Sequence, residues 1–160
     1  MLSGGGTGGH IYPLVAIAEQ LQDQQKIHGL PTDILFIGNG ELMKSEANRM
    51  GVSFSKIWVT KWRRYFSLLN FFGLFILPFS FLQSLIKVWA YMPDVILAKG
   101  GYASFMPAFV GWIMHIPIYV HESDSVPGKV NRWLGKHATA IFTSFDYTSQ
   151  FFDATKVILT

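Results

Sequence analysis

The residues best suited to chemistry stand at positions 4–10, in the segment GGGTGGH. Its five glycines let backbone N–H groups approach a ligand at distances that side chains would prevent. An apolar helical pattern follows from Pro13, and the positive end of a helix dipole favours bound phosphate. His10 adds an imidazole that can exchange a proton near neutral pH. The segment therefore predicts a phosphate site with a candidate base beside it.

Other interpretations of this segment fit less well. Positions 4, 6 and 9 match the G-x-G-x-x-G pattern of nicotinamide and flavin binders, which requires an acidic residue at the end of the second strand. That strand ends in IGNG, and Glu41 comes one position later, so the match is poor. A Walker A loop is excluded, because His10-Ile11 replaces its Lys and Ser or Thr. A glycine turn that only packs a helix on a sheet, with His10 as its cap, is the structural alternative.

Two further polar segments follow predicted strands. KGGY at 99–102 follows the apolar stretch 94–98, and HESD at 121–124 follows the stretch 117–120. Glu122 is a second candidate base at the end of its strand, where it could alternatively cap or pair with the following helix. The carboxyl ends of parallel strands meet at one edge of a sheet, so we expect all three segments to line one crevice.

The elements that must position these segments alternate along the chain. Strands are predicted at 33–37, 53–59, 94–98, 117–120, 138–143 and 156–159, and helices at 13–28, 41–50, 65–86, before 117, and 127–134. Such alternation predicts an α/β fold, a Rossmann-like parallel sheet with helices on both faces. Because only three residues precede the first glycine, we expect the first strand to be largely missing from residues 1–160.

Composition narrows the class of protein. The 160 residues suit one domain, and half of them are hydrophobic. The absence of cysteine excludes a disulfide scaffold and thiolate metal sites. With 13 basic and 10 acidic residues, the net charge of +3 is too weak to predict a nucleic-acid partner. We expect no metal and no cofactor.

Three segments resemble signatures of the MurG family of N-acetylglucosaminyltransferases. They are GGGTGGHIYP at 4–13, PDVILAKGGY at 93–102, and IPIYVHE at 116–122 with Pro127-Gly128 and Asn131 after it. They occur in the family's order and span nearly the whole chain. The resemblance implies the amino-terminal, acceptor-binding half of a two-domain GT-B glycosyltransferase, with the donor-binding carboxy-terminal domain outside these 160 residues.

The resemblance also implies a reaction. N-acetylglucosamine would pass with inversion from UDP-N-acetylglucosamine to the muramyl 4-hydroxyl of lipid I, giving lipid II in peptidoglycan biosynthesis. His10 and Glu122 are the candidate bases, and the sequence leaves the choice between them open. The implied substrate-binding residues are Thr7, Gly8, Gly9, Gly100, Gly101, Tyr102, Asp124 and Asn131. The family usually has Gln-Asn where this chain has Ser123-Asp124, which leaves the sugar specificity open.

The stretch 65–86 contains no charged residue and is dominated by Phe, Leu and Ile. Basic and tryptophan residues flank it, which suits a helix lying on an anionic membrane surface. A buried core helix and a membrane span are the alternatives. The expected membrane contacts are Trp62, Arg63, Arg64, Phe72, Phe75 and Phe79, on a peripheral protein at the cytoplasmic face. The alternative function is a non-catalytic, membrane-associated subunit of a split glycosyltransferase that binds polyprenyl diphosphate.

Overall fold

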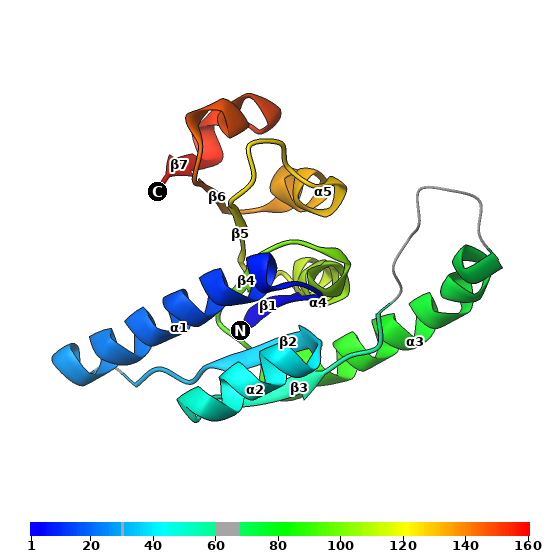
Figure 1. The fold of residues 1–160 in the computed structure, drawn as a ribbon, viewed down its shortest axis with the longest axis horizontal. Helices are drawn as coiled ribbons and strands as arrows, with labels where there is room; N and C mark the ends of the chain where they lie inside the picture. Colours follow the sequence, from blue (N-terminus) through cyan, green and yellow to red (C-terminus); the bar gives the residue numbers. More distant parts are fainter. Residues whose placement is uncertain (30, 60–67) are drawn as a thin grey trace.

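Seven parallel strands form one sheet in the order β3-β2-β1-β4-β5-β6-β7 (Figure 1). The computed structural model describes residues 1–29, 31–59 and 68–160. The strands are β1 (Leu2–Gly5), β2 (Leu35–Asn39), β3 (Ser53–Lys56), β4 (Ile96–Ala98), β5 (Ile118–Glu122), β6 (Ala140–Thr143) and β7 (Val157–Leu159). The prediction of a parallel, Rossmann-like sheet is confirmed, and the strand order reverses direction between β1 and β4.

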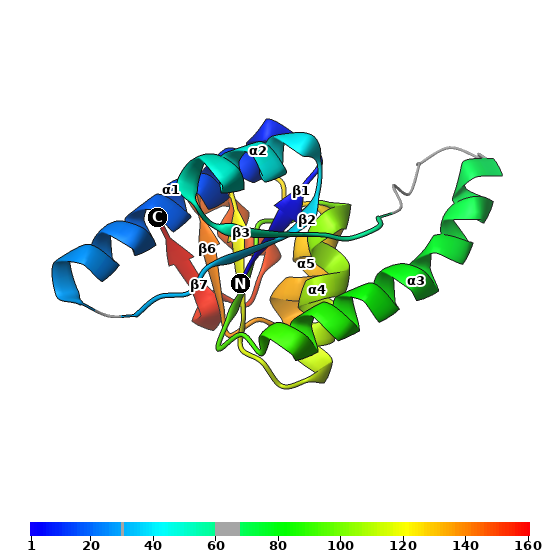
Figure 2. The same cartoon turned by 90° about the horizontal axis from the view of Figure 1, so that it is seen from below.

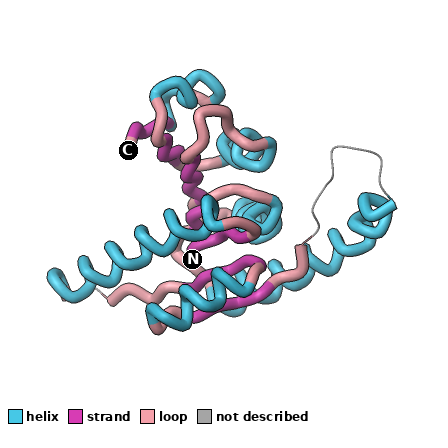
Figure 3. Tube along the Cα trace, viewed as in Figure 1, coloured by secondary structure: helices cyan, strands magenta, loops and turns pink. Residues whose placement is uncertain are grey.

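Helices cover both faces of the sheet, as predicted (Figure 2). One face carries α1 (Gly8–His28) and α2 (Glu41–Met50). The other carries α3 (Leu68–Tyr91), α4 (Tyr102–Ile113) and α5 (Lys129–His137). Two short 3-10 helices, η1 (Asp146–Phe151) and η2 (Ala154–Lys156), connect β6 to β7. Figure 3 shows the resulting alternation of strand and helix along the chain.

The alternation of side chains along β2 divides the core into two layers. Phe36 is fully buried and packs with Leu14 of α1 and Met43 of α2. Its neighbour Ile37 is also fully buried and belongs to the opposite layer, with Val88 of α3. Successive side chains of a strand point to opposite faces, so one strand supports both helical layers.

Helix α1 begins five residues before its predicted start. The prediction placed the start at Pro13, where the apolar helical pattern begins. In the structure Thr7 is the N-cap, and Pro13 lies inside the helix. His10 therefore belongs to the first turn of α1 instead of the loop before it. Helix α2 has its predicted bounds and ends at Gly51, whose φ of 66° is left-handed.

Strand β1 contains residues that the sequence placed in a loop. Gly4 and Gly5 pair with Gly38 and Asn39 of β2, and the strand that was expected to be largely missing is formed over Leu2–Gly5. Close packing explains why glycine occurs there. A Cβ atom on Gly4 would lie 2.6 Å from Cδ1 of Leu14, and one on Gly5 would lie 2.4 Å from the Asn39 carbonyl oxygen.

Candidate functional site

A pocket of about 390 Å³ opens at the carboxyl ends of β1, β4 and β5. This is the place where the strand order reverses, and open α/β sheets bind their ligands at such points. The three segments predicted to share a crevice all reach this edge. The lining residues are His10, Gly101, Tyr102, Glu122, Asp124, Gly128, Lys129, Val130 and Asn131. Of the predicted site residues, Thr7, Gly8, Gly9 and Gly100 lie beside the pocket without lining it.

His10 lies in the first turn of α1 with its ring against the β4–α4 loop. A Cβ atom on Gly101 would be 3.3 Å from Cδ2 of His10 and 3.5 Å from its Nε2, so the ring needs glycine there. Burial lowers the pKa of His10, and the nearby Lys99 ammonium lowers it further, whereas Asp124 and Glu122 oppose both effects. A lowered pKa favours the neutral imidazole, which is the form that can accept a proton.

Glu122 occupies the end of β5 and is 3% exposed. Its Oε1 accepts the Asp124 backbone N–H at 3.0 Å. Its Oε2 accepts the Gly128 N–H at 3.2 Å and the Asn131 Nδ2 at 3.0 Å. Gly128 is the N-cap of α5, so the carboxylate caps that helix and closes the loop between β5 and α5. Both oxygens of this candidate base are thus already bonded to protein donors.

Asn131 lines the pocket and contacts the ends of both β4 and β5. It is 2% exposed, and besides Glu122 its Nδ2 contacts the carbonyl oxygens of His121 at 3.4 Å and Lys99 at 3.5 Å. Gly100, with φ of 95°, packs directly on this amide, since a Cβ there would lie 2.6 Å from Nδ2. The Oδ1 of Asn131 is buried and has no hydrogen-bond partner among the described residues.

Two helix N-termini flank His10. The N-caps of α1 and α4 are Thr7 and Gly101, and within the described structure neither makes a side-chain cap hydrogen bond. Neither first turn contains an acidic residue. Tyr102 covers the loop between them, because a Cβ atom on Gly6 would lie 3.3 Å from its hydroxyl oxygen. The positive dipole ends of two helices make this edge suitable for a diphosphate.

Lys99 is a residue of this site that the sequence did not single out. It follows β4, is 1% exposed, and donates from Nζ to Ser123 Oγ at 2.8 Å. Burial lowers its pKa, while the carboxylates of Glu122 and Asp124 raise it. The available signal was a lysine directly between a buried strand and two glycines, but its hydrogen-bond partner Ser123 lies 24 positions away.

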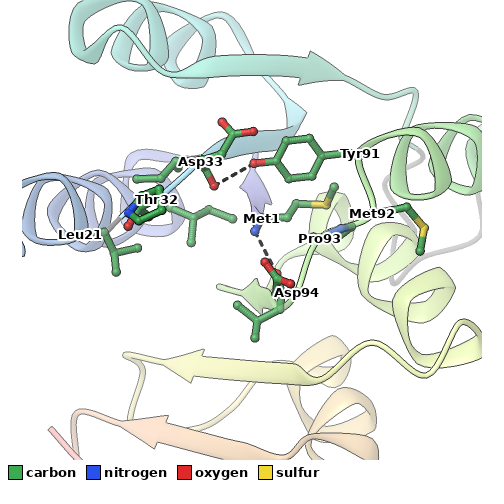
Figure 4. A pocket seen from close by; sticks show the side chains of 12 residues that line it. Met1, Leu21, Thr32, Asp33, Tyr91, Met92, Pro93 and Asp94 are labelled. Carbon is green, nitrogen blue, oxygen red and sulfur yellow. Dashed lines mark hydrogen bonds between the residues drawn. The ribbon is translucent and has the colours of Figure 1, made fainter. Parts of the chain in front are cut away.

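A second pocket, of about 400 Å³, lies at the opposite, amino-terminal edge of the sheet (Figure 4). The Tyr91 hydroxyl donates to the Asp33 carbonyl oxygen at 2.8 Å, and the Met1 amino group donates to the Val95 carbonyl oxygen at 2.9 Å. None of the predicted site residues lines this pocket.

Helix α3 holds the described part of the predicted membrane contacts. Phe75 and Phe79 are exposed, whereas Trp62, Arg63 and Arg64 lie outside the described residues, as does the side chain of Phe72. With Phe75 and Phe79, three more exposed side chains continue one stripe at helical spacing, and we name this set the α3 stripe: Phe75, Phe79, Leu82, Ile86 and Trp89. Among the described residues, no helix combines the length and hydropathy needed to cross a bilayer.

Comparison with known proteins identifies relatives of this chain. The model of the glycosyltransferase family 28 N-terminal domain matches residues 1–143. A protein of Treponema pallidum is 35% identical over 95% of this chain, and one of Pediococcus pentosaceus is 35% identical over all of it. Both are named UDP-N-acetylglucosamine–N-acetylmuramyl-(pentapeptide) pyrophosphoryl-undecaprenol N-acetylglucosamine transferase. The matches cover 38% and 43% of those proteins, so the chain spans about two fifths of their length.

Solved structures show the same fold. MurG of Acinetobacter baumannii superposes on all of this chain with a TM-score of 0.73 at 20% identity, using 43% of its own length. UDP-GlcNAc 2-epimerase of Neisseria meningitidis, bound to UDP-GlcNAc, matches 91% of this chain with a TM-score of 0.59 at 14% identity, using 42% of its own length. The fold is therefore common to enzymes whose names describe different reactions.

Proposed function

Because this chain belongs to the glycosyltransferase family 28 N-terminal domain family, we propose that it forms one half of an inverting N-acetylglucosaminyltransferase. The donor is UDP-N-acetylglucosamine, and the acceptor is the undecaprenyl-diphosphate-linked muramyl pentapeptide, lipid I. The names of its relatives at 35% identity support this pair of substrates. In those relatives the matching segment is part of a longer transferase chain, which favours a catalytic role over the non-catalytic binding subunit.

One observation carries the proposal: the His10 side chain lies between the N-termini of α1 and α4, neither of which has an acidic residue in its first turn. Both substrates contain a diphosphate, which the N–H groups of the first turns of α1 and α4 can bind. His10 then removes the proton from the acceptor 4-hydroxyl. The hydroxyl oxygen bonds to the anomeric carbon as the bond from that carbon to the UDP oxygen breaks. UDP leaves with the electron pair, and the anomeric configuration inverts.

Glu122 has a different role in this proposal. Its two oxygens accept three protein N–H groups, so it shapes the loop that presents Asp124. Asp124 is exposed on the pocket wall and contacts sugar hydroxyl groups. Thr7, Gly8 and Gly9 provide the backbone of one N-terminus, and Gly101 with Tyr102 provides the other. Asn131 and Gly100 hold the two loops together.

The reaction is tested with the complete gene product, radiolabelled UDP-N-acetylglucosamine and lipid I in detergent. We expect label to appear in a β-linked disaccharide lipid, in an amount that grows with the lipid I added. UDP-glucose at the same concentration is the control donor. Release of free sugar without lipid product, or epimerised nucleotide sugar, would contradict the proposed reaction.

We also propose that the α3 stripe places the protein on the cytoplasmic face of the membrane. In Figures 1 and 2 the amino-terminal part of α3 projects beyond the sheet, where a flat surface can reach it. Buried Ser80 and Ser84 form the opposite face of the helix, toward the core. The apolar residues of the α3 stripe therefore face away from the sheet, and a lipid-linked acceptor requires such contact with a bilayer.

Vesicle flotation tests this placement. The complete protein should float with phosphatidylglycerol vesicles. The double variant Phe79→Glu/Ile86→Glu should bind these vesicles more weakly, by about tenfold or more for each apolar side chain that no longer enters the bilayer. Ile27→Glu, which changes an exposed isoleucine of α1, is the matched control. Equal binding of all three proteins would remove the α3 stripe from the interface.

A further inference from the structure

The ammonium group of Lys99 has no task in the reaction proposed above, yet the structure buries it beside the pocket. The residue is 1% exposed, and its Nζ donates to Ser123 Oγ at 2.8 Å. Its backbone is fixed at both ends, because its N–H donates to the Ser3 carbonyl oxygen at 2.9 Å and its carbonyl oxygen faces Asn131 Nδ2. Burying an ammonium is strongly unfavourable unless charges or hydrogen bonds compensate it.

The charge of Lys99 acts on four titratable groups, which belong to α1, β5 and the loop after β5. The carboxylates of Glu122 and Asp124 stabilise it, and it in turn disfavours protonation of His10 and His121. Without the lysine, two carboxylates would stand at an edge that also receives a diphosphate. Like charges in a site of low dielectric constant repel strongly.

We propose that Lys99 is a positioning residue for glycosyl transfer, holding the loop at Ser123 and balancing the charge of Glu122 and Asp124. This inference rests on the proposed function. Its consequence is that Asp124 can accept hydrogen bonds from sugar hydroxyls in the pocket without repelling the substrate diphosphate. Lys99 thereby makes an acidic residue compatible with an anionic substrate.

A double-mutant cycle in the complete protein separates charge balance from packing. Lys99→Met keeps the length of the side chain and removes its charge, and we expect it to raise the substrate KM by about tenfold or more. Asp124→Asn removes the charge to be balanced. In that background, Lys99→Met should change the KM by less than about threefold, because the interaction between the charges of Lys99 and Asp124 is already absent. Lys44→Met, at an exposed position of α2, is the matched control.

The result that would overturn the proposal is an equal effect of Lys99→Met in both backgrounds. Lys99→Arg, which keeps the charge, should retain more activity than Lys99→Met. If the two variants are equally impaired, the lysine has only a packing role.

A second measurement does not require activity. NMR titration of the complete protein should show the pKa of His121, about 4 in the native site, and that of His10 both rising in Lys99→Met. Unchanged histidine titrations would overturn the placement of the ammonium. If both pKa values rise but no sugar is transferred by the native protein, the proposed reaction fails while the charge balance stands.

Discussion

The two edges of the sheet carry pockets of nearly equal volume, about 390 Å³ at the carboxyl ends of the strands and about 400 Å³ at the amino ends. They differ in the hydrogen-bonding groups that surround them. At the carboxyl edge, backbone N–H groups donate to the Glu122 carboxylate, and α1 and α4 begin without an acidic residue in the first turn. At the amino edge, the Tyr91 hydroxyl and the Met1 amino group donate to carbonyl oxygens.

This contrast follows from the parallel sheet. All strands point the same way, and every connecting helix runs back, so helix N-termini gather at one edge and helix C-termini at the other. The first edge attracts anions and the second provides acceptors. The two pockets have similar volumes, but helices begin beside one of them and end beside the other. Four predictions test this contrast between the edges.

The largest effect is expected from His10→Ala at the carboxyl edge. Loss of a general base lowers kcat by about 10²–10⁴-fold. The free energy of unfolding should change little, because the ring is half-buried. Steady-state kinetics and urea unfolding of the complete protein provide the two measurements. His28→Ala, at the exposed far end of the same helix, is the control. Turnover close to that of the native protein would exclude His10 as the base.

Glu122→Gln should affect stability as well as activity. The carboxylate accepts hydrogen bonds from Asp124, Gly128 and Asn131. The amide of glutamine replaces one accepting oxygen with an NH₂ group, so at least one of these donors loses its acceptor. Leaving a buried group without its partner costs about 1–3 kcal/mol in unfolding free energy. Urea unfolding measures this loss against Glu41→Gln, which changes an exposed glutamate at the start of α2. A variant with native stability and no turnover would instead indicate that Glu122 is itself the base.

His121, at the carboxyl edge, should also make the free energy of unfolding depend on pH. Burial, and then the Lys99 charge, lowers the pKa of His121 to about 4, below its ordinary value of 6.5. Between these values the unfolded chain binds more protons than the folded one, so stability falls as the pH falls from 6.5 to 4. His121→Gln should flatten that part of the curve, and His28→Gln should not. Urea midpoints measured at half-unit pH steps provide the comparison, and parallel curves for the native protein and His121→Gln would contradict it.

The smallest effect is expected at the amino edge. Tyr91→Phe removes the hydrogen bond to the Asp33 carbonyl oxygen and should lower the unfolding free energy by about 0.5–1.5 kcal/mol. It should leave kcat and KM unchanged, because this edge takes no part in the reaction. Tyr147→Phe, at an exposed tyrosine of η1, controls for loss of a hydroxyl. A large change in KM for Tyr91→Phe would mean that the amino edge also binds substrate.

Sequence patterns predicted the elements better than their ends. Helix α2 has the predicted bounds because Gly51 stops it locally. Helix α1 begins earlier than predicted, because Thr7 is its N-cap and Pro13 lies inside it. Gly4 and Gly5 were expected in a loop but pair with β2, a strand more than 30 positions away that a local pattern does not contain.

Sequence patterns alone predicted the alternation of strands and helices, the meeting of three polar segments at one edge, and the apolar stretch 65–86, which includes all of the α3 stripe except Trp89. These depend on periodicity and on residue type, which are local properties. Tertiary structure decided the roles within the site. Glu122 is bonded to Asn131, nine positions away, and Lys99 reaches Ser123, 24 positions away. Whether a carboxylate is free to act as a base, or an ammonium is buried, depends on which groups the fold brings to it, and no local pattern contains that information.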